Sequence, residues 1–128
     1  MPAATATSLL QQALSLDAAG DESAAIPLYR RAIAKGLSKE NLHTALIGLG
    51  SSLRTVGETQ SALRTLRRAR KLFPRDAAIT LFIALAHADA RQERFALRQL
   101  ADCLLNESSS PRLTPYRRVL ARKFHALR

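Results

Sequence analysis

The 128-residue chain has one cysteine, no tryptophan and only six aromatic residues of other kinds. A single cysteine excludes an intramolecular disulfide framework and a zinc site built from several cysteines, and it fits a reducing compartment. Glycine and proline are scarce, at five each, which disfavours a β-sandwich or barrel. No apolar run reaches the roughly 18 residues of a membrane span. Residues 1–8 lack the features of a signal peptide, so we expect a cytoplasmic protein.

What the chain has in abundance is alanine and leucine, which together make up 45 of the 128 residues and favour helices. The net charge is +10, and it is concentrated in two blocks. Residues 43–76 carry seven basic and two acidic residues, and residues 111–128 carry six basic and no acidic residues. Such a balance permits binding to nucleic acid or to an acidic protein but establishes neither.

A repeat of about 34 residues organises the chain, and residues 43–76 show it best. There the pattern consists of Leu46, Leu49, Gly50, Leu53, Gly57, Ala62, Leu66, Ala69 and Pro74. The upstream copy keeps Leu9, Ala13, Leu16, Gly20, Ala25, Tyr29 and Ala32, and the downstream copy keeps Ile83, Ala84, His87, Ala96, Leu100 and Cys103. In this spacing the chain resembles the tetratricopeptide repeat (TPR) family, and we expect it to be a small bacterial TPR protein.

The physical pattern points the same way without the family. Leu46, Leu49 and Leu53 form an apolar stripe at helical spacing, and Gly50 offers a site where a second helix can approach closely. Gly57 is a natural stop between the two helices. Each unit is therefore a helical hairpin that buries its apolar face only by stacking on a neighbour.

We predict an all-α protein with seven helices. Six form three hairpins, at about 6–18 with 22–35, 39–56 with 59–73, and 76–90 with 92–105, and Asp21 and Ser38 are the expected N-caps. The resemblance implies a single domain over residues 1–128, a right-handed superhelical stack of three repeats at about 6–39, 43–76 and 77–110.

A seventh helix is expected at about 115–127, with Thr114 as N-cap and Pro115 at its first position. Its predicted apolar face consists of Tyr116, Leu120, Phe124 and Leu127. Such a helix resembles the capping helix that closes a repeat array. The alternative is a basic amphipathic helix for a membrane surface or a partner.

The sequence offers no catalytic constellation and no cofactor or metal site. His43, His87 and His125 lie far apart and lack metal-ligand spacing, and Cys103 occupies a position where a small buried residue is expected. Neither a glycine-rich phosphate loop nor a nucleophile elbow is present. We therefore predict that the protein is not an enzyme.

In TPR proteins the first helix of each hairpin lines a concave groove that binds peptides or partner proteins. The resemblance assigns this groove to Leu10, Leu14, Asp17, Thr44, Ile47, Ser51, Arg54, Leu81, Leu85 and Ala88. The lining is mostly aliphatic, which suits a peptide, an amphipathic helix or a second copy of the chain. The alternative is that neighbouring helices cover these side chains.

Basic residues recur on the second helices and on the last helix, which the resemblance places on the convex face. The predicted basic patch comprises Arg64, Arg67, Arg68, Lys71, Arg94, Arg98, Arg118 and Arg122. The alternative is an ordinary solvated face, since Glu93 and Asp102 interrupt it and no aromatic residues are interleaved for base stacking.

The sequence thus predicts a non-catalytic protein-interaction module whose partner is a peptide, a helix or a second copy. The rival function is a basic protein that binds nucleic acid or an anionic surface, although we expect nucleic acid to be an unlikely partner. An accessory subunit of an enzyme would have the same sequence features.

Overall fold

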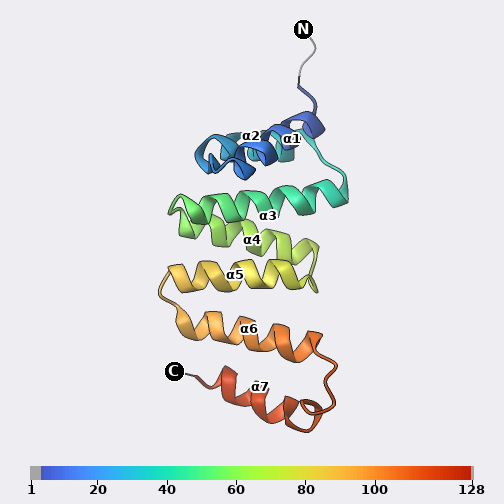
Figure 1. Cartoon of the computed structure of the whole chain (residues 1–128), viewed down its shortest axis with the longest axis vertical. Coiled ribbons are helices and arrows are strands. Elements are labelled where there is room, and N and C mark those ends of the chain that lie inside the picture. The colour runs from blue at the N-terminus through green and yellow to red at the C-terminus, as the bar shows by residue number, and fades with distance from the viewer. Residues whose placement is uncertain (1–3, 128) are drawn as a thin grey trace. The chain divides into compact units, whose positions relative to one another are not determined.

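The computed structural model describes residues 4–127, and within them it contains helices and no strand. Figure 1 shows the helices in chain order. They are α1 (Ala6–Ala18), α2 (Glu22–Lys35), α3 (Lys39–Thr55), α4 (Thr59–Leu72), α5 (Ala77–Asp89), α6 (Glu93–Glu107) and α7 (Arg117–His125), with a 3₁₀ turn, η1 (Thr114–Tyr116), before α7. The predicted all-α class is confirmed, and the six hairpin helices lie within two residues of their expected bounds.

The chain forms two compact units. Unit 1 is Met1–Pro74 and contains the hairpins α1–α2 and α3–α4. Unit 2 is Arg75–Arg128 and contains the hairpin α5–α6 together with η1 and α7. Each unit is described by itself below.

The same turn closes all three hairpins. In each, one amide returns to a carbonyl five residues earlier: Asp21 to Leu16, Glu58 to Leu53 and Gln92 to His87, each at 2.8 Å. The residue before that amide has a positive φ, as a Schellman ending requires. Gly20 and Gly57 supply it in unit 1, and Arg91, with φ of 58°, supplies it in unit 2.

The expected caps are present. The Asp21 side chain accepts a hydrogen bond from the Ala24 amide, and the Ser38 hydroxyl accepts one from the Asn41 amide, both at 3.3 Å. Pro27 lies inside α2, and the helix continues through it. These local signals fix where α2 and α3 begin.

Small residues let the helices of unit 1 approach one another. A Cβ added at Gly50 would lie 2.6 Å from the Leu66 side chain, so α4 packs directly on the backbone of α3. A Cβ at Gly48 would lie 2.5 Å from the Tyr29 ring of α2. Tyr29 itself is fully buried. Helix α3 packs against both α1 and α2 and so encloses the core of the unit.

Unit 2 differs from unit 1, because its last helix, α7, does not pack against both helices of the hairpin before it. Helix α7 packs against α6 and makes no contact with α5 among the described residues. The Arg117 guanidinium donates to the Leu105 and Ser108 carbonyls, and His125 Nε2 lies 2.9 Å from Asp102 Oδ1. No residue of α7 is fully buried.

Three expectations about the C-terminal region are wrong. Thr114 is not the N-cap of α7, because it lies in η1, and Pro115 precedes the helix. Tyr116 does not join the packed face of α7, since it is also in η1 and is exposed. Cys103 is a free thiol that is half-buried, not fully buried. The first two errors share one cause, since α7 begins at Arg117, after the 3₁₀ turn.

Candidate interaction surfaces

The predicted groove residues lie in both units. Leu14 and Thr44 are exposed in unit 1, and Ile47, Ser51 and Arg54 are half-buried there. Leu10 was assigned wrongly, because it is only 3% exposed and belongs to the core of unit 1. Leu10 belongs to the same buried cluster as Ala25 of α2 and Leu49 of α3.

In unit 2 an apolar face is open to solvent. Its large side chains have exposed fractions between 43% and 62%, and they are Leu81 and Leu85 on α5 with Leu97, Leu100 and Leu104 on α6. We call these five residues the leucine surface. The three on α6 follow i, i+3, i+7 spacing and so share one side of that helix.

A hollow of about 300 Å³ lies within the leucine surface. Its lining is entirely aliphatic and consists of Leu81, Ala84, Leu85, Ala88, Ala96 and Leu100. Helix α7 does not contact α5, so it leaves Leu81 and Leu85 open. Helix α7 therefore packs on α6 but covers neither the α5 leucines nor Leu97, Leu100 and Leu104 of α6.

A buried polar contact in unit 1 was not predicted. Tyr29 on α2 donates a 2.6 Å hydrogen bond from its hydroxyl to Asp17 Oδ2 on α1, and the Ser52 hydroxyl on α3 donates to the same oxygen at 3.2 Å. Burial, reinforced by the hydrogen bond to Asp17 and its negative charge, raises the pKa of Tyr29 above its ordinary value. The carboxylate thus joins three helices and is not simply a helix-end charge.

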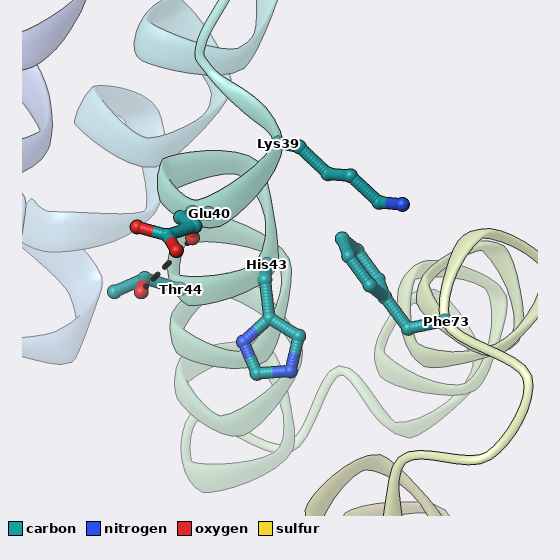
Figure 2. A pocket seen from close by; sticks show the side chains of 5 residues that line it. All are labelled: Lys39, Glu40, His43, Thr44 and Phe73. Atoms are coloured by element: carbon teal, nitrogen blue, oxygen red, sulfur yellow. Dashed lines mark hydrogen bonds between the residues drawn. The ribbon is translucent and has the colours of Figure 1, made fainter.

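A second hollow, of about 380 Å³, is in unit 1 and lies between the start of α3 and the end of α4. Figure 2 shows Lys39 extended toward the Phe73 ring, with His43 beside it. The His43 and Phe73 rings meet edge to face, with centroids 4.8 Å apart, and Lys39 Nζ lies 5.8 Å from the Phe73 centroid. These contacts fasten the two helix ends together, so His43 has a packing role here.

The other two histidines also make structural contacts. His87 is buried, and its Nδ1 lies 2.8 Å from Gln92 Oε1 across the α5–α6 turn. His125 pairs with Asp102 between α7 and α6. Among the residues described, no group of three or more His, Cys, Asp or Glu side chains is placed to hold a metal ion.

The predicted basic residues divide between the units. Those on α4 are exposed in unit 1, namely Arg64, Arg67, Arg68 and Lys71. In unit 2, Arg94, Arg118 and Arg122 are exposed. Arg98 is half-buried: it lies 5.4 Å from the Phe95 centroid and donates to the Leu127 carbonyl, so it serves the α6–α7 contact.

A third hollow, of about 410 Å³, lies beside the α4 arginines and was not predicted. Its lining comes from three helices of unit 1 and consists of Arg30, Ile33, Ala34, Leu49 and Arg68. Arg30 lies on α2 and Arg68 on α4, so spacing along a single helix does not connect the two residues.

The repeated hairpin turn and the small residues at the helix crossings agree with a comparison against family models, in which the tetratricopeptide repeat model matches residues 6–127. The chain belongs to the tetratricopeptide repeat family. Proteins of the TPR family generally act as non-catalytic scaffolds for protein–protein interaction. A search of curated proteins found no match to this TPR chain. Within residues 4–127, no TPR helix combines the length and hydrophobicity that crossing a membrane demands.

Proposed function

We propose that this TPR protein is a non-catalytic interaction module that binds a peptide, a helix or a second copy of itself through an apolar groove. The observation that carries the proposal is the leucine surface of unit 2. Monomeric soluble proteins rarely leave a contiguous apolar patch of more than a few hundred Å² uncovered. Five exposed leucines, three of which line an aliphatic hollow, therefore favour a surface that a partner covers.

The lining of the hollow defines the chemistry of the occupant. It offers aliphatic side chains alone, so a polar group placed there would lose its hydrogen bonds to water without replacement. An aliphatic or aromatic side chain from an amphipathic helix fits best, with anchors at i, i+3 or i+4 spacing matching the rows on α5 and α6.

The groove residues of unit 1 belong to the same proposal. Leu14, Thr44, Ile47, Ser51 and Arg54 would contact a partner from the first helices of the first two repeats. An Ile47→Asp variant tests this part, because a charge in a dry contact is costly whereas one facing water is not. Loss of folding in that variant would place Ile47 in the core.

We also propose that the repeats at about 6–39, 43–76 and 77–110, with the helix at about 115–127, act as one right-handed superhelical domain in the cytoplasm. Small-angle X-ray scattering of the whole chain tests the single domain. A stack gives one compact scattering particle, whereas two freely hinged units give a larger and broader one.

The decisive comparison uses two leucines of equal exposure. Leu85, in the leucine surface, and Leu72, on α4 in unit 1, are each 45% exposed. We expect Leu85→Asp to abolish self-association in sedimentation velocity, or co-purification of a partner from the native host, and Leu72→Asp to retain it. Equal behaviour of the two variants, with both folded by circular dichroism, would contradict the proposal.

A further inference from the structure

The hollow between α2, α3 and α4 is lined by two arginines and by apolar residues, and we call it the arginine hollow. Arg30 and Arg68 are exposed at its sides. Leu49 lies at the base and is buried, and Ile33 beside it is half-buried. The volume of about 410 Å³ is within the range of pockets that hold part of a ligand.

The helices that line the arginine hollow carry mostly positive charge, and their acidic residues, Glu22 on α2 and Glu40 on α3, lie in the first turns. Helix α4 has no acidic residue, and the only one on α2 is Glu22 in its first turn. Exposed basic residues surround the two arginines on the same helices, namely Arg31, Lys35, Arg64, Arg67 and Lys71. Within residues 4–127, neither Arg30 nor Arg68 has an ion-pair partner. Their guanidinium groups are therefore available to an external anion.

We infer that the arginine hollow binds an acidic peptide segment that carries an aliphatic or aromatic side chain among its aspartates or glutamates. Guanidinium groups match carboxylates in a two-pronged geometry, which explains why arginine suits the walls. The apolar side chain of the peptide would cover Ile33 and Leu49. This inference is independent of the leucine surface, which lies in unit 2.

The apolar floor favours a peptide over a nucleic acid. A sugar–phosphate backbone would meet the arginines but has no aliphatic group to fill the hollow. Bases bind most readily on exposed aromatic rings, and the aromatic residue of α2, Tyr29, is fully buried. Phe73, which follows α4, lies against His43. The hollow therefore lacks a stacking platform.

Fluorescence anisotropy with three labelled probes tests the inference on the whole chain. The first probe is a short peptide of glutamate and aspartate with one central leucine, the second has glycine in place of that leucine, and the third is an oligothymidylate. We expect the leucine peptide to bind about tenfold more tightly than the glycine peptide, because only the leucine can bury apolar area.

Variants then locate the site. The double variant Arg30→Gln with Arg68→Gln should weaken binding of the leucine peptide about tenfold, since both carboxylate contacts are lost. The matched control is Arg112→Gln with Arg122→Gln, which removes the same charge from exposed positions in unit 2. It should change binding little. Ala34→Phe fills the hollow without changing charge, and it should remove the preference for leucine over glycine.

Two results would overturn the inference. One is a control variant that weakens peptide binding as much as the arginine variant, which would show a general effect of charge. The other is an oligothymidylate that binds more tightly than either peptide and is insensitive to Ala34→Phe, which would show a polyanion surface. All of these substitutions are at exposed positions, and circular dichroism confirms that each variant is folded.

Discussion

The Tyr29 hydroxyl donates a 2.6 Å hydrogen bond to Asp17 Oδ2, and this contact joins α2 to α1 inside unit 1. Ser52 of α3 donates to the same carboxylate oxygen, and the α3 backbone at Gly48 lies against the Tyr29 ring. The first hairpin and the first helix of the second thus meet at one polar point in an otherwise aliphatic core. We therefore expect the stability of unit 1 to depend on the protonation of that hydroxyl.

The first prediction concerns alkaline pH. Because the pKa of Tyr29 is raised in the folded state, its contribution to stability is complete below the unfolded-state value of about 10. It is lost as pH rises above that value, since the unfolded chain then releases the proton first. We expect the urea midpoint of the wild type to fall between about pH 9.5 and 11, where tyrosine titrates.

Tyr29→Phe isolates this effect. The variant should lose about 1–2 kcal/mol at neutral pH, because Asp17 keeps only its bond from Ser52. It should also show a weaker alkaline decline than the wild type, whereas Tyr116→Phe, at an exposed position, should behave as the wild type does. If the urea midpoint of Tyr29→Phe fell at alkaline pH as much as that of the wild type, groups other than Tyr29 would be the cause.

The second prediction concerns Gly48. A methyl group there would lie 2.5 Å from the Tyr29 ring, which its hydrogen bond to Asp17 holds in place. We expect Gly48→Ala to cost about 1–3 kcal/mol in chemical denaturation, as overpacking usually does. Ser51→Ala on the same helix, at a half-buried position, is the control and should stay near the wild type.

The hairpin boundaries and the close approach at Gly50 could be predicted from the sequence, because glycine positions, caps and apolar stripes are local signals. The role of Gly48 could not, because its partner Tyr29 is on another helix and Gly48 lies outside the repeat pattern. Leu10 was misplaced for a related reason. Periodicity identifies the apolar side of α1, but only the structure shows that Leu10 joins a buried cluster with residues of α2 and α3.

The interaction surfaces too could be predicted from the sequence only in part, because they combine residues of different helices. Leu81 and Leu85 could be chosen from their register in the repeat, and both are exposed. Their neighbours Leu97 and Leu104 were missed, because the second helix was assumed to face away from the groove. Arg30 and Arg68 line the same hollow only because α2 and α4 both lie beside Leu49 of α3. Spacing along a single helix does not reveal this.

The third prediction concerns Arg91, which adopts a positive φ of 58° where the equivalent turns of unit 1 have Gly20 and Gly57. A residue with a side chain costs about 1–2 kcal/mol in this conformation. Replacing it with glycine removes that cost, but part of the gain is lost because glycine gives the unfolded chain more conformational freedom. Arg91→Gly should therefore raise stability by about 0.5 kcal/mol in thermal unfolding. Ala90→Gly, beside it at a negative φ, should lower stability, and the opposite order would refute the account of this turn.

The fourth prediction concerns the attachment of α7. Arg117 donates to the carbonyls of Leu105 and Ser108 and is half-buried, whereas Arg118 is exposed. We expect Arg117→Ala to accelerate hydrogen exchange of the α7 amides by about tenfold or more, since each lost charged hydrogen bond is worth about 1.5 kcal/mol or more. Arg118→Ala should have little effect. Equal exchange in both variants would show that apolar packing of Leu120 and Phe124 alone holds the helix.

We propose that a partner binds at the leucine surface of unit 2. A photoreactive benzophenone residue placed at Leu100, which lines the aliphatic hollow, tests it directly, with the same residue at Leu72 as the control for an equally exposed leucine. The measurement is the set of cross-linked products formed in extract of the native host or between copies of the purified chain. We expect one discrete product from position 100 that Leu85→Asp removes, and none from position 72. Products from position 72 alone, or identical products from both positions, would contradict it.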